Sequence, residues 1–244
     1  MKKLLAAILV LTLALSMVAF AMAEGAMSYA DYAAAAIDDE VTVEAYVQAH
    51  QSWWDGKVTI YAADQDGAYF LYEVPCSEAD AEKLVPGVKI RATGFKSEWS
   101  GEIEIADISS FEILEDAEQF VANPVDVTDI LGDTDALAEN MNRLVSFKGM
   151  TVEPSKIEGD ETEYAFLYNW DGSGEEGANN DLYFNVSKDG ATYTFTVESY
   201  LTGEGSEVYE AVKALNIGDV VDLEGFLYWY NGANPHITAV KAAE

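Results

Sequence analysis

The chain has 244 residues, half of them hydrophobic, and its 13 basic and 44 acidic side chains give a formal net charge of −31. The hydrophobic share supports packed cores and excludes a disordered chain, while the charge disfavours nucleic-acid backbones and anionic membranes at long range. The single cysteine, Cys76, excludes a disulfide framework. We interpret Cys76 as a small apolar residue and the acidity as a means of solubility.

The first residues have the pattern of a secretory signal peptide. Residues 1–3 carry two lysines, residues 4–20 are apolar, and residues 21–23 (AMA) form a small-x-small cleavage site. The apolar run is short for a membrane span. The sequence therefore predicts cleavage before Glu24, which changes the net charge from −31 to −33. It also predicts a secreted mature chain that has no membrane partner.

The part after the leader begins with a short helix and a set of strands. Ser28 is the expected N-cap of the first helix and Ser77 that of the second, each with an acidic residue three positions later. The predicted elements are a helix at 28–36, strands at 41–47, 57–62 and 68–74, a helix at 77–84, and strands from 87 and from 102. This order, three strands, a helix and two strands, is that of the OB-fold, a five-stranded barrel.

The second half repeats that order with one additional strand. Pro124 marks a linker, and the elements that follow are a helix at 134–141, strands at 143–152, 163–169, 182–187 and 191–200, a helix at 206–215, and strands from 218 and from 236. We predict an all-β protein with short helices, made of two tandem OB-fold-like barrels. The predicted parts are a signal peptide at 1–23, domains at 24–115 and 127–244, and a linker at 116–126. The place of the additional strand stays open.

One stretch occurs in both halves. Residues 87–95 (GVKIRATGF) are followed by KSEWSG, and residues 218–226 (GDVVDLEGF) by LYWYNG. Apolar and polar positions alternate in each copy, which predicts a strand with one buried face. A glycine inside a strand weakens it, so Gly94 and Gly225 predict a bend or bulge at a barrel corner.

This arrangement resembles the small bacterial OB-fold modules found on secreted nucleases and other extracellular proteins. In each half the resemblance rests on a helix before an alternating Val-rich strand, on the Gly-x-x-[Ile/Val]-x-x-x-Gly-Phe strand, and on a Ser100-Gly101 or Asn231-Gly232 turn. In that family the module commonly accompanies a separate catalytic domain, for which no room is left here. The resemblance therefore implies an accessory part that binds or positions a ligand.

Aromatic residues are the main candidates for ligand contact. All five Trp fall in predicted loops or turns, and the loops between strands one and two and between strands four and five flank the ligand groove of an OB-fold. Aromatic faces there stack on bases or on sugar rings. The alternative is that these rings plug barrel ends or join the two domains. The aromatic candidates are Trp53, Trp54, Tyr61, Tyr72, Trp99, Trp170, Tyr228, Trp229 and Tyr230.

Basic candidates are confined to the first predicted barrel. They are Lys57, Lys89, Arg91 and Lys96. The second copy has Val220 and Asp222 in place of two of them, so any phosphate contact would belong to the first barrel. Nucleic-acid affinity depends heavily on Lys and Arg, and the chain is strongly acidic. We expect these four side chains to be solvated charges.

No catalytic or metal site is expected. Two acidic turns, at residues 64–67 and 171–176, offer oxygen ligands for calcium, but neither matches the twelve-residue calcium loop, and polar hairpin turns explain them better. No zinc spacing, nucleophile elbow or phosphate loop occurs. We predict a secreted, non-catalytic module without cofactor that recognises an oligosaccharide or a partner protein. The alternatives are a nucleic-acid-binding accessory protein and a hydrolase that uses paired carboxylates.

Overall fold

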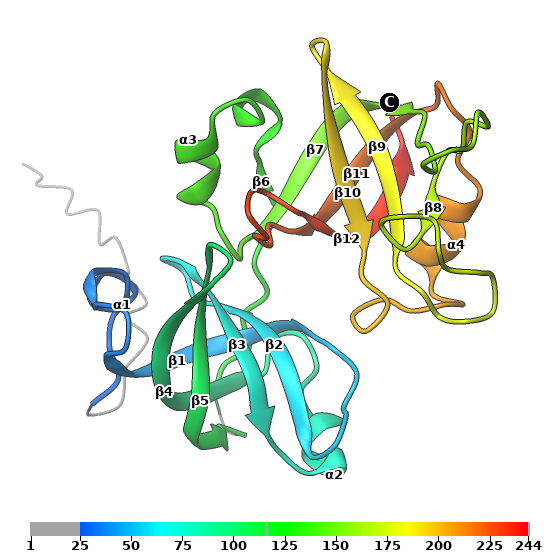
Figure 1. Ribbon diagram of the computed structural model, residues 1–244. Helices are drawn as coiled ribbons and strands as arrows, with labels where there is room; N and C mark the ends of the chain where they lie inside the picture. Colours follow the sequence, from blue (N-terminus) through cyan, green and yellow to red (C-terminus); the bar gives the residue numbers. More distant parts are fainter. Residues whose placement is uncertain (1–24, 116, 244) are drawn as a thin grey trace, which may run out of the picture.

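The computed structural model describes residues 25–115 and 117–243 of the chain, and it contains two β-barrels (Figure 1). The predicted signal peptide and its cleavage site lie outside the described residues. Within the described part, no helix has the length and apolar character needed to cross a membrane.

The first barrel has five strands that close in the order β1-β2-β3-β5-β4. Its elements are α1 (Tyr29–Ala34), β1 (Glu40–His50), β2 (Lys57–Ala63), β3 (Ala68–Pro75), α2 (Glu78–Ala81), β4 (Lys89–Trp99) and β5 (Glu102–Ile113). The side chains of Ser28 and Ser77 cap the two helices as predicted, each accepting a hydrogen bond from a backbone N–H three residues later.

The second barrel repeats this design. Its elements are β6 (Val125–Asp126), η1 (Thr128–Ile130), α3 (Thr134–Ala138), β7 (Leu144–Glu153), β8 (Leu167–Tyr168), β9 (Leu182–Lys188), β10 (Ala191–Val197), α4 (Glu207–Lys213), β11 (Val220–Phe226) and β12 (His236–Ala242). The sheet order β7-β11-β12-β10-β9 closes through pairing of β7 with β9, and β6 and β8 flank this five-stranded barrel. The strand order in both halves is that of the OB-fold and confirms the predicted fold class.

Two predicted strands are shorter than expected. The additional strand, predicted at 163–169, is reduced to β8, which pairs with β9. The strand predicted to reach residue 200 ends at Val197, because Glu198 forms a turn. Its carboxylate accepts a hydrogen bond from Tyr200 N, and its carbonyl accepts bonds from Leu201 N and Thr202 N. Trp99, expected in a turn, is the last residue of β4.

The duplicated glycines lie at bulges, as predicted. The register between β4 and β5 shifts around Gly94, and that between β11 and β12 shifts at Gly225. A Cβ atom at Gly94 would lie 2.7 Å from the carbonyl oxygen of Ala106, and one at Gly225 would lie 2.3 Å from that of His236. Both glycines are therefore required because strand five passes too close for a side chain.

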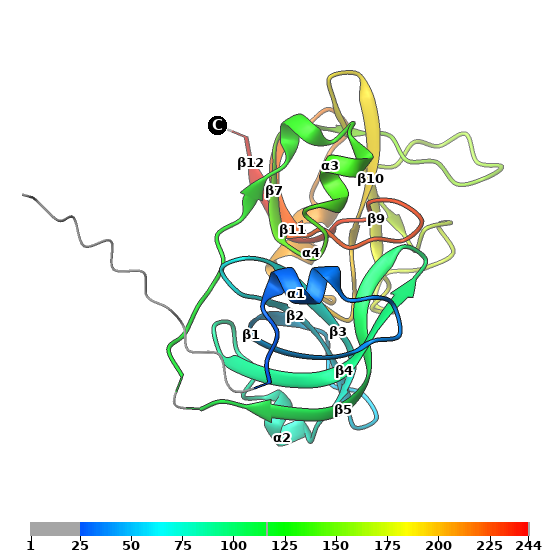
Figure 2. The same ribbon diagram turned by 90° about the vertical axis from the view of Figure 1, so that its left-hand side faces the viewer.

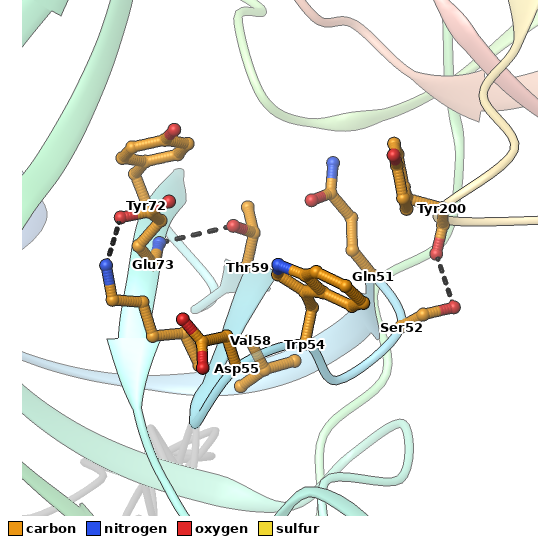
Figure 3. A pocket seen from close by; sticks show the side chains of 10 residues that line it. Gln51, Ser52, Trp54, Asp55, Val58, Thr59, Tyr72, Glu73 and Tyr200 are labelled. Carbon is orange, nitrogen blue, oxygen red and sulfur yellow. Dashed lines mark hydrogen bonds and ion pairs between the residues drawn. The ribbon is translucent and has the colours of Figure 1, made fainter.

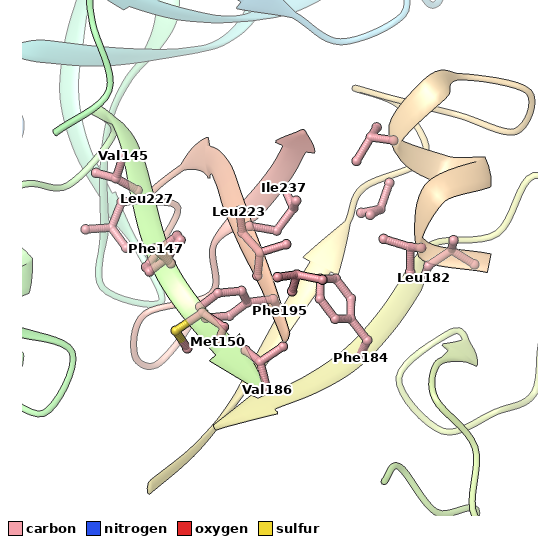
Figure 4. Close-up of a cluster of buried hydrophobic side chains, with 14 of the residues drawn as sticks. Val145, Phe147, Met150, Leu182, Phe184, Val186, Phe195, Leu223, Leu227 and Ile237 are labelled. Carbon is pink, nitrogen blue, oxygen red and sulfur yellow. The ribbon is translucent and has the colours of Figure 1, made fainter. Parts of the chain in front are cut away.

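Each barrel is closed by a short parallel seam. Strands β3 and β5 are joined at a single register pair, Leu71 with Ile105, and strands β10 and β12 at Thr196 with His236. The antiparallel neighbours pair over longer stretches. The core of the second barrel lies inside these strands, where Phe147, Phe184 and other apolar side chains interdigitate (Figure 4).

The two barrels pack directly on each other. Tyr61 of β2 is fully buried, stacks on Phe226 of the second barrel at 4.3 Å between ring centroids, and its hydroxyl lies 3.0 Å from Nδ1 of His236. Phe70 of β3 contacts Tyr228 at 5.5 Å between centroids. Figure 2 shows α1 of the first barrel below α3 of the second. Large apolar rings therefore hold the barrels together.

The two copies of the aromatic turn also meet. Asn231 N donates to Ser100 O at 2.7 Å, and the rings of Trp99 and Tyr230 are 5.2 Å apart. Trp229 packs over Gly101 so closely that a Cβ there would lie 2.8 Å from the indole. The two copies of the duplicated stretch therefore contact each other at this interface, and Gly101 makes room for the ring of Trp229.

The segment predicted as a linker contacts both barrels. Phe120 packs on Tyr46 of the first barrel at 5.5 Å between centroids, and Ala122 N donates to Oε1 of Gln48 at 2.8 Å. Val125 then pairs with Val145 of the second barrel. The domain limits given above stay predictions.

Candidate ligand-binding site

A groove lies on the outer surface of the first barrel, and we call it the outer groove. It has a volume of about 320 Å³ and is formed by the β1–β2 loop, by β2 and β3, and by one residue of the second barrel (Figure 3). Its lining residues are Gln51, Ser52, Trp54, Asp55, Lys57, Val58, Thr59, Tyr72, Glu73 and Tyr200. Strands two and three and these loops form the ligand face of OB-folds, so the groove lies where the fold predicts.

A second hollow lies between the two barrels, and we call it the inter-barrel cavity. Its volume of about 390 Å³ is within the range of about 300–1,000 Å³ typical of small-molecule sites. Its lining residues are Gln51, Phe70, Tyr72, Trp99, Glu104, Glu198, Tyr228 and His236. The outer groove and the inter-barrel cavity share Gln51 and Tyr72, so the two hollows adjoin.

Strand alternation explains why these side chains reach the hollows. Leu71 and Ile105, the seam residues of β3 and β5, are fully buried in the first barrel. Their neighbours Phe70, Tyr72 and Glu104 point to the opposite face. Because β3 and β5 are adjacent, this face presents two aromatic rings beside one carboxyl group.

Four aromatic residues of the two hollows keep large exposed areas: Tyr200 of the second barrel, which is 61% exposed, and three residues of the first barrel. Trp54 is 77% exposed, Tyr72 43% and Trp99 52%, and all three belong to the first barrel. Tyr72 borders both hollows, with Trp54 in the outer groove and Trp99 in the inter-barrel cavity. Exposed apolar surface of this kind commonly marks a binding surface.

The carboxyl groups near the inter-barrel cavity have raised pKa values. Burial raises the pKa of Glu104, with a smaller contribution from the charge of Glu73. Burial also raises the pKa of Glu198 to about 7, assisted by Asp181 and opposed by hydrogen bonds from Tyr200, Leu201 and Gln51. Perturbed carboxyl groups in a hollow are typical of functional sites.

Glu102 lies at the edge of the interface between the barrels and is completely buried. Its Oε2 atom accepts a hydrogen bond from Trp229 N at 2.8 Å, whereas its Oε1 atom has no partner among the described residues. Burial raises the pKa of Glu102 to about 8, against the lowering effect of the nearby Asn142 side chain and of the hydrogen bond from Trp229 N. The group is therefore protonated at neutral pH.

His236 forms part of the wall of the inter-barrel cavity. Its ring stacks on Tyr228 at 4.4 Å between centroids. Complete burial lowers the pKa of His236 to about 3, so the ring is neutral at physiological pH. His236 consequently adds an aromatic surface and no positive charge.

The predicted basic residues are engaged in contacts within the protein. Lys57 lines the outer groove and pairs with Glu73 at 2.6 Å. Lys89 pairs with Glu44 at 2.6 Å, and Nε of Arg91 donates to the same carboxylate at 2.9 Å.

Lys96 is buried and donates to the carbonyls of Tyr32, Ala33 and Ala35 at 3.0, 2.9 and 2.8 Å, at the end of α1. Among the described lining residues, no Lys or Arg borders the inter-barrel cavity.

The remaining predicted aromatic residues divide between surface and interface. Trp53 lies beside the groove, where its indole N–H donates to Cys76 O at 3.0 Å. Trp170 is exposed in a turn of the long loop between β8 and β9. Tyr61 and Trp229 are buried between the barrels, as the alternative role for the aromatic residues anticipated. The structure therefore brings together Trp54, Tyr72, Trp99 and Tyr228 from the predicted set, and Tyr230 joins them through Trp99.

The sequence analysis missed several residues of the two hollows. They are Gln51, Ser52, Asp55, Val58, Thr59, Phe70, Glu73, Glu104, Glu198, Tyr200 and His236. Phe70 and Glu104 could have been found from strand alternation, because each follows or precedes a core position on a predicted strand. Glu198, Tyr200 and His236 carry no local signal, since only the packing of the second barrel brings them to the first.

The acidic turns have structural roles. Oδ1 of Asp64 accepts hydrogen bonds from Asp66 N and Gly67 N, and its Oδ2 accepts one from the Tyr69 hydroxyl. Oδ1 of Asp171 likewise accepts one from Ser173 N. In residues 25–115 and 117–243, no group of three or more His, Cys, Asp or Glu side chains is arranged to hold a metal ion.

No family model matches the chain, and no curated protein matches it. Several solved structures are similar over most of their length. The p204 HINb domain is 12% identical, with 85% of this chain and 98% of that chain covered and a TM-score of 0.36. A murine DNA-binding protein bound to double-stranded DNA is 14% identical, with 84% and 100% covered and a TM-score of 0.33.

A deletion variant of the single-stranded DNA-binding protein from Thermus aquaticus is 12% identical, with 84% and 94% covered and a TM-score of 0.26. At these identities and scores the comparisons carry no argument about a ligand. The assignment to the OB-fold rests on the strand order of the two barrels.

Proposed function

We propose that this is an exported, non-catalytic protein that binds an oligosaccharide along the outer groove and the inter-barrel cavity. The observation that carries the proposal is the set of exposed rings, Trp54, Tyr72 and Trp99, on the ligand face of the first barrel. OB-folds use this face for oligonucleotides and oligosaccharides.

The polar groups of the outer groove favour a sugar over a phosphate chain. Gln51, Ser52, Asp55 and Thr59 offer amide, hydroxyl and carboxylate groups, which suit the hydroxyls of a sugar. Lys57 is already paired with a carboxylate, and the whole chain is strongly acidic. A phosphate backbone would therefore find no free cation at Lys57 and would be repelled by the net negative charge of the chain.

Single-stranded nucleic acid is the second candidate. The same exposed rings can stack on bases, because every base has an aromatic face. Binding of nucleic acid would be confined to the first barrel, where the four candidate basic residues lie.

Calorimetry tests the proposal by measuring how tightly the protein binds a panel of neutral oligosaccharides and of single-stranded oligonucleotides. We expect a neutral oligosaccharide to bind with little dependence on salt. Trp99→Ala and Tyr72→Ala should each weaken it about five-fold or more, since a stacked ring contributes about 1–3 kcal/mol. Phe95→Ala is the control, because Phe95 is an exposed aromatic of β4 that lines neither hollow.

The opposite results are distinct. Oligonucleotide binding that falls steeply with salt, together with no oligosaccharide binding, would support the second candidate and refute the first. Chromatography of the bound oligosaccharide should recover it intact, and cleavage products would support the alternative of a hydrolase. N-terminal sequencing of protein from the culture medium should begin at Glu24, which checks export.

A further inference from the structure

Glu104 is a buried carboxyl group without a partner. It is 7% exposed and lines the inter-barrel cavity. Among residues 25–115 and 117–243, no side chain or backbone group forms a hydrogen bond or an ion pair with its carboxyl group. Its carboxyl oxygens are not among the inaccessible polar atoms, so they remain open to the cavity. An acid that is largely removed from water is costly without a partner, so an occupant of the cavity is the natural partner.

A second carboxyl group borders the same cavity without a cation. Oε1 of Glu198 accepts a hydrogen bond from Tyr200 N at 3.1 Å, and Oε2 accepts one from Nε2 of Gln51 at 3.2 Å. These are neutral donors, and no ion pair of Glu198 occurs in the described part of the chain. The cavity therefore contains two acids and, as noted above, no Lys or Arg.

Aromatic rings form most of the remaining wall. Phe70, Tyr72, Trp99 and Tyr228 all border the cavity. The face of an aromatic ring carries partial negative charge and attracts an ammonium group, most strongly in a desolvated site. The net charge of −31 also draws cations toward the protein from a distance. Rings, carboxyl groups and the overall field all favour a positively charged occupant.

We propose that the inter-barrel cavity binds the ammonium group of an amino sugar within the oligosaccharide, with Glu104 as its main counter-ion. The proposal rests on the proposed oligosaccharide binding and deepens it by naming the charged group that the ligand carries. Glu198 is the second acceptor, and the rings of Tyr72 and Trp99 enclose the ammonium group and its sugar.

A sugar suits the site better than the lysine side chain of a peptide. The inter-barrel cavity adjoins the outer groove through Gln51 and Tyr72, so a chain of rings can extend from one to the other. Trp54 in the outer groove then offers a face for the next ring of the same chain. A single flexible lysine side chain would leave this outer aromatic residue unused.

Calorimetry on the purified protein with three probes tests the proposal. The probes are a glucosamine tetramer, the fully N-acetylated tetramer and a trilysine peptide. We expect the glucosamine tetramer to bind at least about ten-fold more tightly than the acetylated one, because acetylation removes the charge that pairs with Glu104. High salt should weaken only the charged tetramer.

Glu104→Gln should remove most of the preference for the glucosamine tetramer over the acetylated tetramer. Glu198→Gln, a second variant, should reduce it in part, and Glu112→Gln, which changes an exposed acid of the same strand β5, should leave it unchanged. A melting curve of each variant shows whether it is folded. The probe and salt comparisons use the unaltered protein, so they decide the question even if a variant fails to fold.

The outcomes separate this proposal from the proposed function. Equal binding of both tetramers, or discrimination that survives in Glu104→Gln, would overturn the ammonium site while oligosaccharide binding stands. Trilysine binding as tight as that of the glucosamine tetramer would overturn the assignment to a sugar. Failure of both tetramers to bind would overturn the ammonium site, whereas the proposed function falls only if the whole oligosaccharide panel also fails to bind.

Discussion

Replacing Glu102 with Gln should stabilise the protein at neutral and alkaline pH. Gln has the shape of a protonated Glu, and it keeps an oxygen that can accept the hydrogen bond from Trp229 N. Its amide also supplies a donor beside Asn142, whose Oδ1 atom is buried without a partner among the described residues. The Gln side chain therefore stays uncharged at every pH, as the buried site favours.

The magnitude follows from the pKa of Glu102, which burial raises from 4.5 to about 8. Between pH 4.5 and about 8, Glu102 is protonated in the native state and ionised in the unfolded chain. The stability that the proton provides is fully present below pH 4.5 and is lost as the pH rises through about 8. At 1.36 kcal/mol for each pKa unit, the loss is about 3 kcal/mol at pH 7 and about 5 kcal/mol above pH 8.

Urea unfolding of both proteins in a series of buffers measures this effect. The difference in unfolding free energy, variant minus parent, should be small near pH 4.5 and grow in favour of Glu102→Gln as the pH rises. Glu112→Gln is the control for removing an acid from the same strand. A difference that does not change with pH, or one that favours the parent at high pH, would show that Glu102 is ionised in the native state.

Two further changes test the packing of the barrels. Gly225→Ala should lower the unfolding free energy by about 3 kcal/mol, because the new Cβ would lie 2.3 Å from the carbonyl oxygen of His236. Gly132→Ala is the control, because nothing lies within 4 Å of a Cβ at that position. Equal losses of stability in the two variants would contradict the close approach at Gly225. Lys96→Met should cost about 3 kcal/mol, because three carbonyls at the end of α1 lose their donor. Lys83→Met, at an exposed lysine, should have little effect, and a small loss in both variants would show that water replaces the Lys96 ammonium group.

The barrels could be predicted from the sequence because their signals are local. Alternation placed Ile90 and Leu223 on buried faces, and the strand glycines Gly94 and Gly225 predicted the bulges that the structure contains. Serine caps fixed the starts of helices in the same way. Such signals depend on a few neighbouring residues, so they survive without knowledge of the tertiary structure.

The candidate site could be predicted only in part. The exposed rings of Trp54 and Trp99 follow from the predicted loop of one and the strand end beside a loop of the other, but Glu198 and His236 reach the inter-barrel cavity only through the packing of the second barrel. The role of Lys96 was also hidden, because a lysine on a strand looks like a solvated charge until α1 is placed above it. Contacts between distant segments leave no periodic pattern in a sequence.

The short parallel seams between β3 and β5 and between β10 and β12 have a consequence for the opening of the two barrels. The first seam, Leu71 with Ile105, is flanked by the cavity residues Tyr72 and Glu104, and the second seam contains the cavity residue His236. A ligand in the inter-barrel cavity would touch both seams at once. Its binding free energy would then add to the cost of opening either barrel. Amide hydrogen exchange of the core strands should consequently slow in both barrels together, although the ligand would contact only one end of each.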